Sequence, residues 1–95
     1  MSYTLVMKSQ RLTYNVVYQA EPEGGYTATV PSLPGCITYG RTIDEAMTMV
    51  KDAITGYLAS MRKHGETIPS DERTLAGTID VLDRTKSRAK RLAYA

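Results

Sequence analysis

Few side chains in this chain of 95 residues could act as metal ligands or nucleophiles. It contains one cysteine, Cys36, and one histidine, His64, and neither belongs to a C-x-x-C or H-x-x-x-H pattern. His64 follows an expected helix, where an exposed end residue is the simplest interpretation. No histidine precedes Cys36 that could act as its base, which favours a small buried side chain over a nucleophile. We therefore expect no metal site and no thiol chemistry.

Paired carboxylates are the other feature that could carry chemistry. Glu21 and Glu23 lie in an expected turn, and Asp44 and Glu45 are adjacent at an expected helix start, where neighbouring side chains do not converge. A two-metal nuclease needs several carboxylates at strand ends to hold ions about 4 Å apart. The expected strand at residues 12–20 contains no Asp or Glu, and the glycines lack the spacing of a phosphate-binding loop. The sequence thus predicts a protein without catalytic residues or a cofactor, and a residual hydrolase is the weakest alternative.

The composition predicts one small domain with a thin core. Apolar residues make up 42% of the chain, but Trp and Phe are absent and seven Tyr and five Met take their place. A chain of this size buries little surface, so a homo-oligomer, either a dimer or a tetramer, is expected. A single cysteine cannot form an internal disulfide, and neither a signal peptide nor an apolar run of about 20 residues is visible. These features favour a cytoplasmic protein without a membrane segment.

Charge divides the chain into two parts. Residues 1–83 contain seven basic and ten acidic residues, a net charge of −3, whereas residues 84–95 contain five basic and no acidic residues. We interpret residues 1–83 as an α+β domain and residues 84–95 as a basic C-terminal tail. The five basic residues of the tail are candidate nucleic-acid contacts through phosphates: Arg84, Lys86, Arg88, Lys90 and Arg91.

Alternating polarity predicts three strands. Residues 12–20 alternate with period two, and residues 21–25 form a Pro- and Gly-containing turn before a second strand at residues 26–30. Pro34-Gly35 fits the central pair of a type II turn, which leads into a short strand at residues 36–39. The three strands should form an antiparallel meander.

The next segment carries a strong helix signal. Thr42-Ile43-Asp44-Glu45 matches a capping box, and apolar residues then recur at the three- and four-residue spacing of one buried stripe up to Met61. Gly65 suits the position after the helix.

After the helix, residues 74–82 alternate again and predict a fourth strand that returns to the sheet, and residues 3–7 could add an edge strand. The expected fold is therefore α+β, β-β-β-α-β, with one long helix on one face of the sheet and the other face left for solvent or a partner.

The order and spacing of these motifs resemble the HicB family of antitoxins. The resemblance rests on the run G-Y-T-A-T-V-P-S-L-P-G-C at residues 25–36, on Gly40, Thr42 and the Asp44-Glu45-Ala46 helix start, and on G-E-T-I-P at residues 65–69. The resemblance covers roughly residues 12–70. It is a resemblance to a short form of the family, without a clear C-terminal DNA-binding domain. The resemblance implies a truncated ribonuclease-H-like fold without nuclease carboxylates. It also implies an antitoxin of a type II toxin–antitoxin system, which binds and occludes a HicA-like toxin that cleaves messenger RNA.

An acidic domain suits a basic RNA-binding partner, because charge complementarity aids encounter and specificity. We expect the partner contacts on the first hairpin, on the loop at residues 32–35 and on the acidic helix start. The candidate residues are Glu21, Glu23, Tyr26, Ser32, Leu33, Asp44 and Glu45. The alternative function is that of an oligomeric nucleic-acid-binding regulator without a toxin partner, which would bind through its basic tails.

Overall fold

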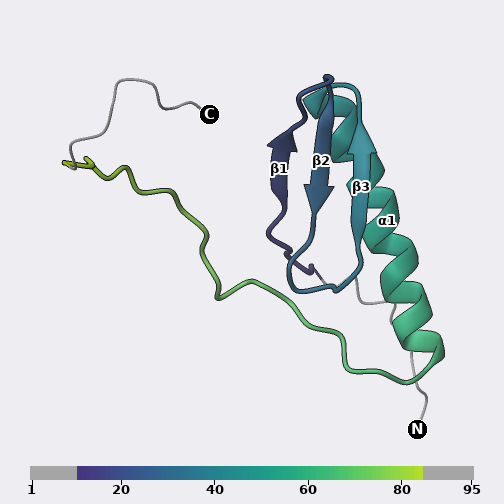
Figure 1. The fold of residues 1–95 in the computed structure, drawn as a ribbon. Coiled ribbons are helices and arrows are strands. Elements are labelled where there is room, and N and C mark those ends of the chain that lie inside the picture. The colour runs from purple at the N-terminus through teal and green to yellow at the C-terminus, as the bar shows by residue number, and fades with distance from the viewer. Residues whose placement is uncertain (1–10, 85–95) are drawn as a thin grey trace, which may run out of the picture.

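The computed structural model describes residues 11–84, which form a three-stranded antiparallel sheet and one long helix (Figure 1). The strands are β1 (Val17–Ala20), β2 (Tyr26–Thr29) and β3 (Ile37–Gly40), in the order β1-β2-β3, and the helix is α1 (Ile43–Lys63). The predicted meander followed by a helix, an α+β fold, is confirmed. The possible strand at residues 3–7 and residues 85–95 of the tail lie outside the described residues.

Both turns of the meander form as their glycines predict. In the β1–β2 hairpin, the amide of Gly24 donates to the carbonyl of Glu21, and Gly24 and Gly25 have φ values of 108° and 84°. In the β2–β3 loop, the amide of Cys36 donates to the carbonyl of Leu33 at 2.9 Å, and Gly35 between them has a φ of 84°. A positive φ at this position is what a type II turn requires.

The capping box fixes the start of α1. The Thr42 hydroxyl accepts a hydrogen bond from the Glu45 amide at 3.1 Å, and the Glu45 carboxylate accepts one from the Arg41 amide at 2.5 Å. The amide of Glu45, which the first turn leaves free, and the amide of Arg41 just before the cap are thereby satisfied. At the other end of the helix, Gly65 has a φ of 70° and its amide donates to the Arg62 carbonyl. Among residues 11–84, no helix combines the length and apolar character that crossing a bilayer would need.

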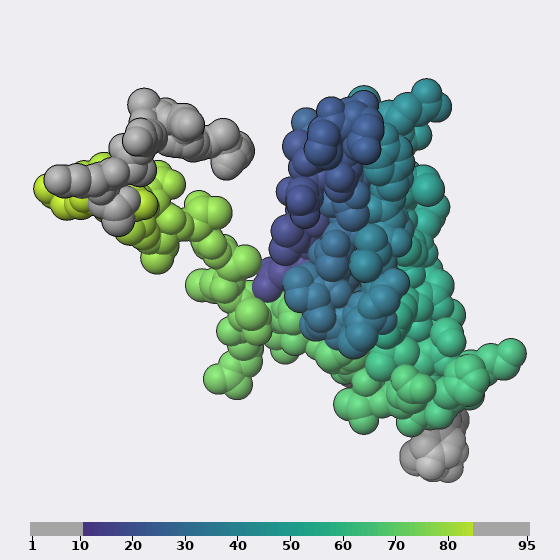
Figure 2. Space-filling view, in the orientation of Figure 1, coloured from purple at the N-terminus to yellow at the C-terminus, as the bar shows by residue number. Residues whose placement is uncertain are grey.

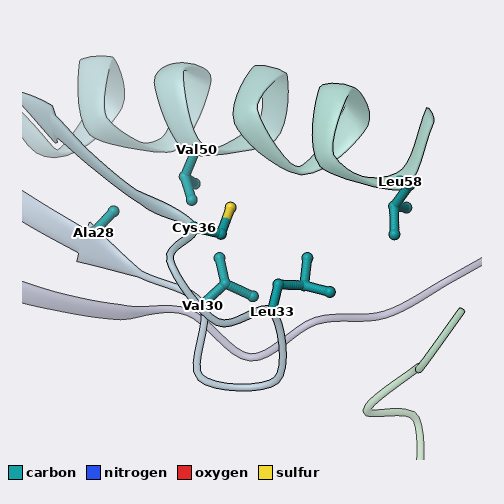
Figure 3. Packing of buried hydrophobic residues seen from close by; sticks show 6 residues of the cluster. All are labelled: Ala28, Val30, Leu33, Cys36, Val50 and Leu58. Atoms are coloured by element: carbon teal, nitrogen blue, oxygen red, sulfur yellow. The ribbon is translucent and has the colours of Figure 1, made fainter. Parts of the chain in front are cut away.

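The core lies between α1 and one face of the sheet. Val50 and Leu58 point from α1 toward the sheet, where they meet buried side chains from β2 and the β2–β3 loop (Figure 3). These buried side chains are Ala28, Val30, Leu33 and Cys36. The helix packs mainly against β3 and less closely against β2. At Gly40, a Cβ atom would lie 2.3 Å from the amide nitrogen of Ala46, so only glycine allows β3 and α1 to approach this closely.

Two of the expected strands differ in the structure. Strand β1 begins at Val17 and not at residue 12, because β2 ends at Thr29 and offers no backbone partner to the residues before Val17. The prediction of a fourth strand in the sheet is wrong for the described chain. Residues 74–82 are extended but pair with no strand of residues 11–84, and they lead away from the sheet (Figure 1). The radius of gyration is accordingly 19.2 Å, compared with about 12 Å for a compact domain of this length.

Candidate protein-binding surface

The sheet face opposite α1 is an exposed surface of mixed apolar and hydroxyl side chains, which we call the open face. The strand register places Val17, Thr29 and Ile37 in one row across the sheet, and Gln19, Thr27 and Tyr39 in another. Val17, Ile37 and Tyr39 are 52%, 58% and 50% exposed. This face is turned toward the viewer in Figure 2. Such exposure of large apolar side chains on one face is typical of a surface that another molecule covers.

Five of the candidate contact residues, Tyr26 and four carboxylates, lie together at one end of the sheet. Tyr26 pairs with both Ala20 and Gly40, so the β1–β2 hairpin and the start of α1 lie at the same end, which we call the hairpin end (Figure 1). The carboxylates gathered there belong to Glu21, Glu23, Asp44 and Glu45.

The four carboxylates differ in their surroundings. Glu23 and Asp44 are exposed. Glu21 is half-buried and accepts a hydrogen bond from the Thr27 hydroxyl at 2.5 Å, while Glu45 caps the helix. Glu23 and Asp44 are therefore the carboxylates of this end with the greatest freedom to meet a partner.

Ser32 and Leu33 lie at the opposite end of the sheet, in the β2–β3 loop. Leu33 is 0% exposed and belongs to the core, so its side chain does not reach the surface. The Ser32 hydroxyl donates to the Asp71 carboxylate at 3.0 Å. Both residues hold the fold together at this end, and the structure does not bring them near the acidic hairpin end.

Asp71 joins three segments that are far apart in the sequence. Its carboxylate accepts hydrogen bonds from the Asn15 amide at 2.9 Å and from the Ser32 hydroxyl, and its own amide donates to the Thr13 carbonyl at 2.7 Å. Nearby, the Tyr14 hydroxyl donates to the Pro69 carbonyl at 2.5 Å. No local sequence pattern predicts this junction, because every bond spans more than thirty residues.

Burial perturbs two titratable groups near the core. It raises the pKa of the Cys36 thiol, which keeps that side chain protonated and unreactive. Burial also raises the pKa of Tyr14, and the Asp71 carboxylate contributes in the same direction. Among residues 11–84, no three His, Cys, Asp or Glu side chains converge as a metal site would need.

A groove runs between β1 and α1 on the helix side of the sheet. It has a volume of about 560 Å³ and is lined by side chains of α1 and of residues 12–18. The groove is largely apolar because Tyr14, Val16 and Tyr18 form one wall, and Met47 and Ile54 of α1 line the opposite wall. The groove exists because α1 lies over β3 and β2 and leaves the inner side of β1 partly uncovered.

The candidate nucleic-acid contacts lie at the end of the described chain or beyond it. Arg84 is exposed and is the last described residue. Lys86, Arg88, Lys90 and Arg91 lie outside the described residues.

Comparison with known proteins identifies the family. A family model described as HicB-like antitoxin of bacterial toxin–antitoxin system matches residues 14–87. The chain belongs to the HicB-like antitoxin family. This HicB-like match includes the whole sheet, α1 and the extended residues 74–82 that follow it.

Relatives of this HicB-like chain include UPF0150 proteins and HicB antitoxins. A UPF0150 protein of Thermoplasma acidophilum is 43% identical over 60 residues, which cover 63% of this chain and 87% of that protein. A UPF0150 protein of Synechocystis is 33% identical over 67 residues, covering 70% and 85%. Antitoxin HicB of Escherichia coli is 34% identical over 58 residues, covering 61% of this chain and 42% of that antitoxin. The chain thus matches less than half the length of the E. coli antitoxin.

Proposed function

We propose that this protein is a non-enzymatic antitoxin of a type II toxin–antitoxin system. In this proposal it binds a HicA-like toxin that cleaves messenger RNA and covers the toxin's RNA-binding surface in the cytoplasm. The observation that carries the proposal is the open face, because a sheet covered by a helix on one side only presents a ready surface for a partner. Membership in the HicB-like antitoxin family supports the same function.

Occlusion requires contact area and complementary charge but no reactive group. A standard interface buries about 800 Å² on each partner. The open face supplies apolar contacts through Val17, Ile37 and Tyr39, and the adjoining hairpin end supplies Glu23 and Asp44. Carboxylates at the rim attract a basic protein and exclude wrong partners. We therefore propose the open face together with the hairpin end as the toxin-binding surface.

Growth rescue tests the function itself. Expression of the neighbouring gene's product alone should arrest growth if that product is a HicA-like toxin, and co-expression of this chain should restore growth. The two proteins should also purify as a complex. A neighbouring gene without toxicity, or toxicity that this chain does not relieve, would refute the antitoxin function.

Paired substitutions test the surface. Ile37→Asp places a charge on the open face, and Met49→Asp places one on a helix residue that is 45% exposed and away from that face. Glu23→Lys and Asp52→Lys form a second pair, which reverses charge at the hairpin end and on exposed α1. We expect Ile37→Asp and Glu23→Lys to weaken toxin binding at least about tenfold, a change of about 1.4 kcal/mol. Equal losses within each pair, measured by isothermal titration calorimetry, would exclude this surface.

The charge of the C-terminal tail favours a second candidate function, binding of nucleic acid by an oligomer. Several copies would combine tails of charge +5, and phosphate contacts through them would weaken steeply with added salt. Replacing the five basic residues with Gln should abolish DNA or RNA binding in fluorescence anisotropy at low salt. Binding that survives this change would remove the tail from consideration.

A further inference from the structure

Residues 74–82 have the pattern of a half-buried strand but are among the most exposed parts of the described chain. Leu75, Ile79 and Val81 alternate along one face and are 95%, 86% and 82% exposed. Gly77 completes that face, while Thr78 and Asp80 lie on the other. Alternation of this kind is typical of a strand with one face on a core. The family match runs to residue 87, so these residues belong to the unit that the family shares.

The segment starts beside residues 13–15, which precede β1, and is then directed away from the groove. The Asp71 amide bonds to the Thr13 carbonyl, and the Asn15 side-chain amide donates to the Thr74 carbonyl at 3.2 Å. Leu75 and Ala76 then lie near Val17 and Pro31 on the open-face side of the sheet. Beyond them the chain extends away from its own domain (Figure 1). The segment therefore does not occupy the β1–α1 groove of its own chain.

The groove and the β1 edge together have the features of a vacant strand position. Among residues 11–84, β1 pairs only with β2, so it is an edge strand of the described sheet. Beside it, the groove presents Tyr14, Val16 and Tyr18 on one wall and α1 on the other. Thr13 and Asn15, which precede β1, already bond to residues 70–74 of the same chain, so the vacant edge is that of β1 itself, Val17–Ala20. A strand laid on this edge would direct every second side chain into the groove.

We propose that residues 78–82 of one copy pair with the outer edge of β1 in a second copy. Ile79 and Val81 enter the β1–α1 groove of that copy, and the second copy returns the same contact. This reciprocal exchange covers both grooves, satisfies the free backbone groups of both β1 edges and encloses the exposed apolar face of both segments. A second copy is the partner because Ile79 and Val81 form an exposed apolar face that suits the groove, and their own chain directs them away from it. This inference does not depend on the antitoxin function, and its test needs no toxin.

Sedimentation equilibrium of the full chain at micromolar concentration gives the first test. The unmodified chain should have the mass of two chains. Ile79→Asp places a charge in the groove and should shift the mass to that of one chain. Thr78→Asp places the same charge on the opposite face of the segment and should leave the two-chain mass unchanged. Circular dichroism of α1 shows whether each variant is folded, and Val81→Asp replaces Ile79→Asp if the latter loses its helical signal.

Isotope-filtered nuclear Overhauser spectra locate the segment directly. In a sample mixed from labelled and unlabelled unmodified chains, methyl groups of Ile79 and Val81 should show contacts between chains with the ring of Tyr18 and with Ile54. A one-chain mass would overturn the proposal. Contacts found only within one chain would overturn it too, and so would a dimer that neither Ile79→Asp nor Val81→Asp weakens.

Discussion

Two threonines on opposite faces of the sheet show how the surroundings of a single hydroxyl decide its contribution to stability. The Thr38 hydroxyl faces α1, is buried and has no hydrogen-bond partner among the described residues. The Thr27 hydroxyl donates to the Glu21 carboxylate on the open face. A buried hydroxyl without a partner costs free energy, whereas a bond to a carboxylate contributes to stability.

These surroundings predict opposite effects for the same substitution. Thr38→Val replaces the unpaired hydroxyl with a methyl group of similar shape and should raise the free energy of unfolding by about 1 kcal/mol. Thr27→Val removes a hydrogen bond to a charged acceptor and should lower it by about 1–2 kcal/mol. Urea denaturation monitored by circular dichroism measures both values. If both variants were destabilised alike, the Thr38 hydroxyl would have a partner in solution.

Among the elements, the junction at Asp71 determines where the chain goes after α1. Its carboxylate joins the segment before β1 to the β2–β3 loop, and its backbone holds the chain beside Thr13. Asp71→Ala removes both acceptor bonds and should lower the free energy of unfolding by about 1–3 kcal/mol. Asp71→Asn keeps one oxygen and should cost less. Glu72→Ala, at an exposed neighbouring position, is the control, and an equal loss there in urea denaturation would contradict the role of Asp71.

Local sequence signals predicted the elements whose caps, turns or apolar stripes are formed by neighbouring residues. The Thr42–Glu45 capping box, the glycines of both turns and the apolar stripe of α1 depend on neighbours within a few residues, and the structure confirms them. Alternation is a weaker guide, because it indicates which way side chains point but not whether a backbone partner exists. Residues 12–16 and 74–82 both alternate, yet neither pairs with a neighbouring strand in the described chain.

The candidate contact residues show a similar limit. The acidic residues near the hairpin and the helix start lie at one end of the sheet. The turn and the helix cap were each predicted from local residues, and the strand pairing brings them together. Leu33 is predicted as a contact residue of the loop at residues 32–35, but the loop folds it into the core. No contact is predicted for Asp71, since its partners Asn15 and Ser32 are distant in the sequence. Contacts of this range follow from the assembled fold and leave no local pattern.

For the whole molecule, the property that determines stability is a small buried core together with a large exposed apolar surface. Only Ala28, Val30, Leu33, Cys36, Ala46, Val50 and Leu58 form the buried apolar core of the described residues. A domain with so little buried surface is marginal by itself. Association between copies would add the burial that the single chain lacks.

The melting temperature should therefore depend on protein concentration. Mass action stabilises a folded dimer as the concentration rises, so the melting temperature should increase over an about hundredfold range of concentration. Differential scanning calorimetry measures this shift, and Ile79→Asp should flatten it while Thr78→Asp should not. A melting temperature independent of concentration for the unmodified chain would show that the domain gains no stability from self-association.

The exposed edge strands of the three-stranded sheet have a consequence for solubility. A strand that donates to one neighbour and receives from another can build fibres, because each added chain exposes the same unsatisfied margin again. When two chains exchange the segment reciprocally, they form a closed dimer, and no further chain can be added through this contact. Changes that lengthen or stiffen the stretch around Thr74, and so prevent two chains from facing each other, should convert a soluble protein into one that precipitates as filaments.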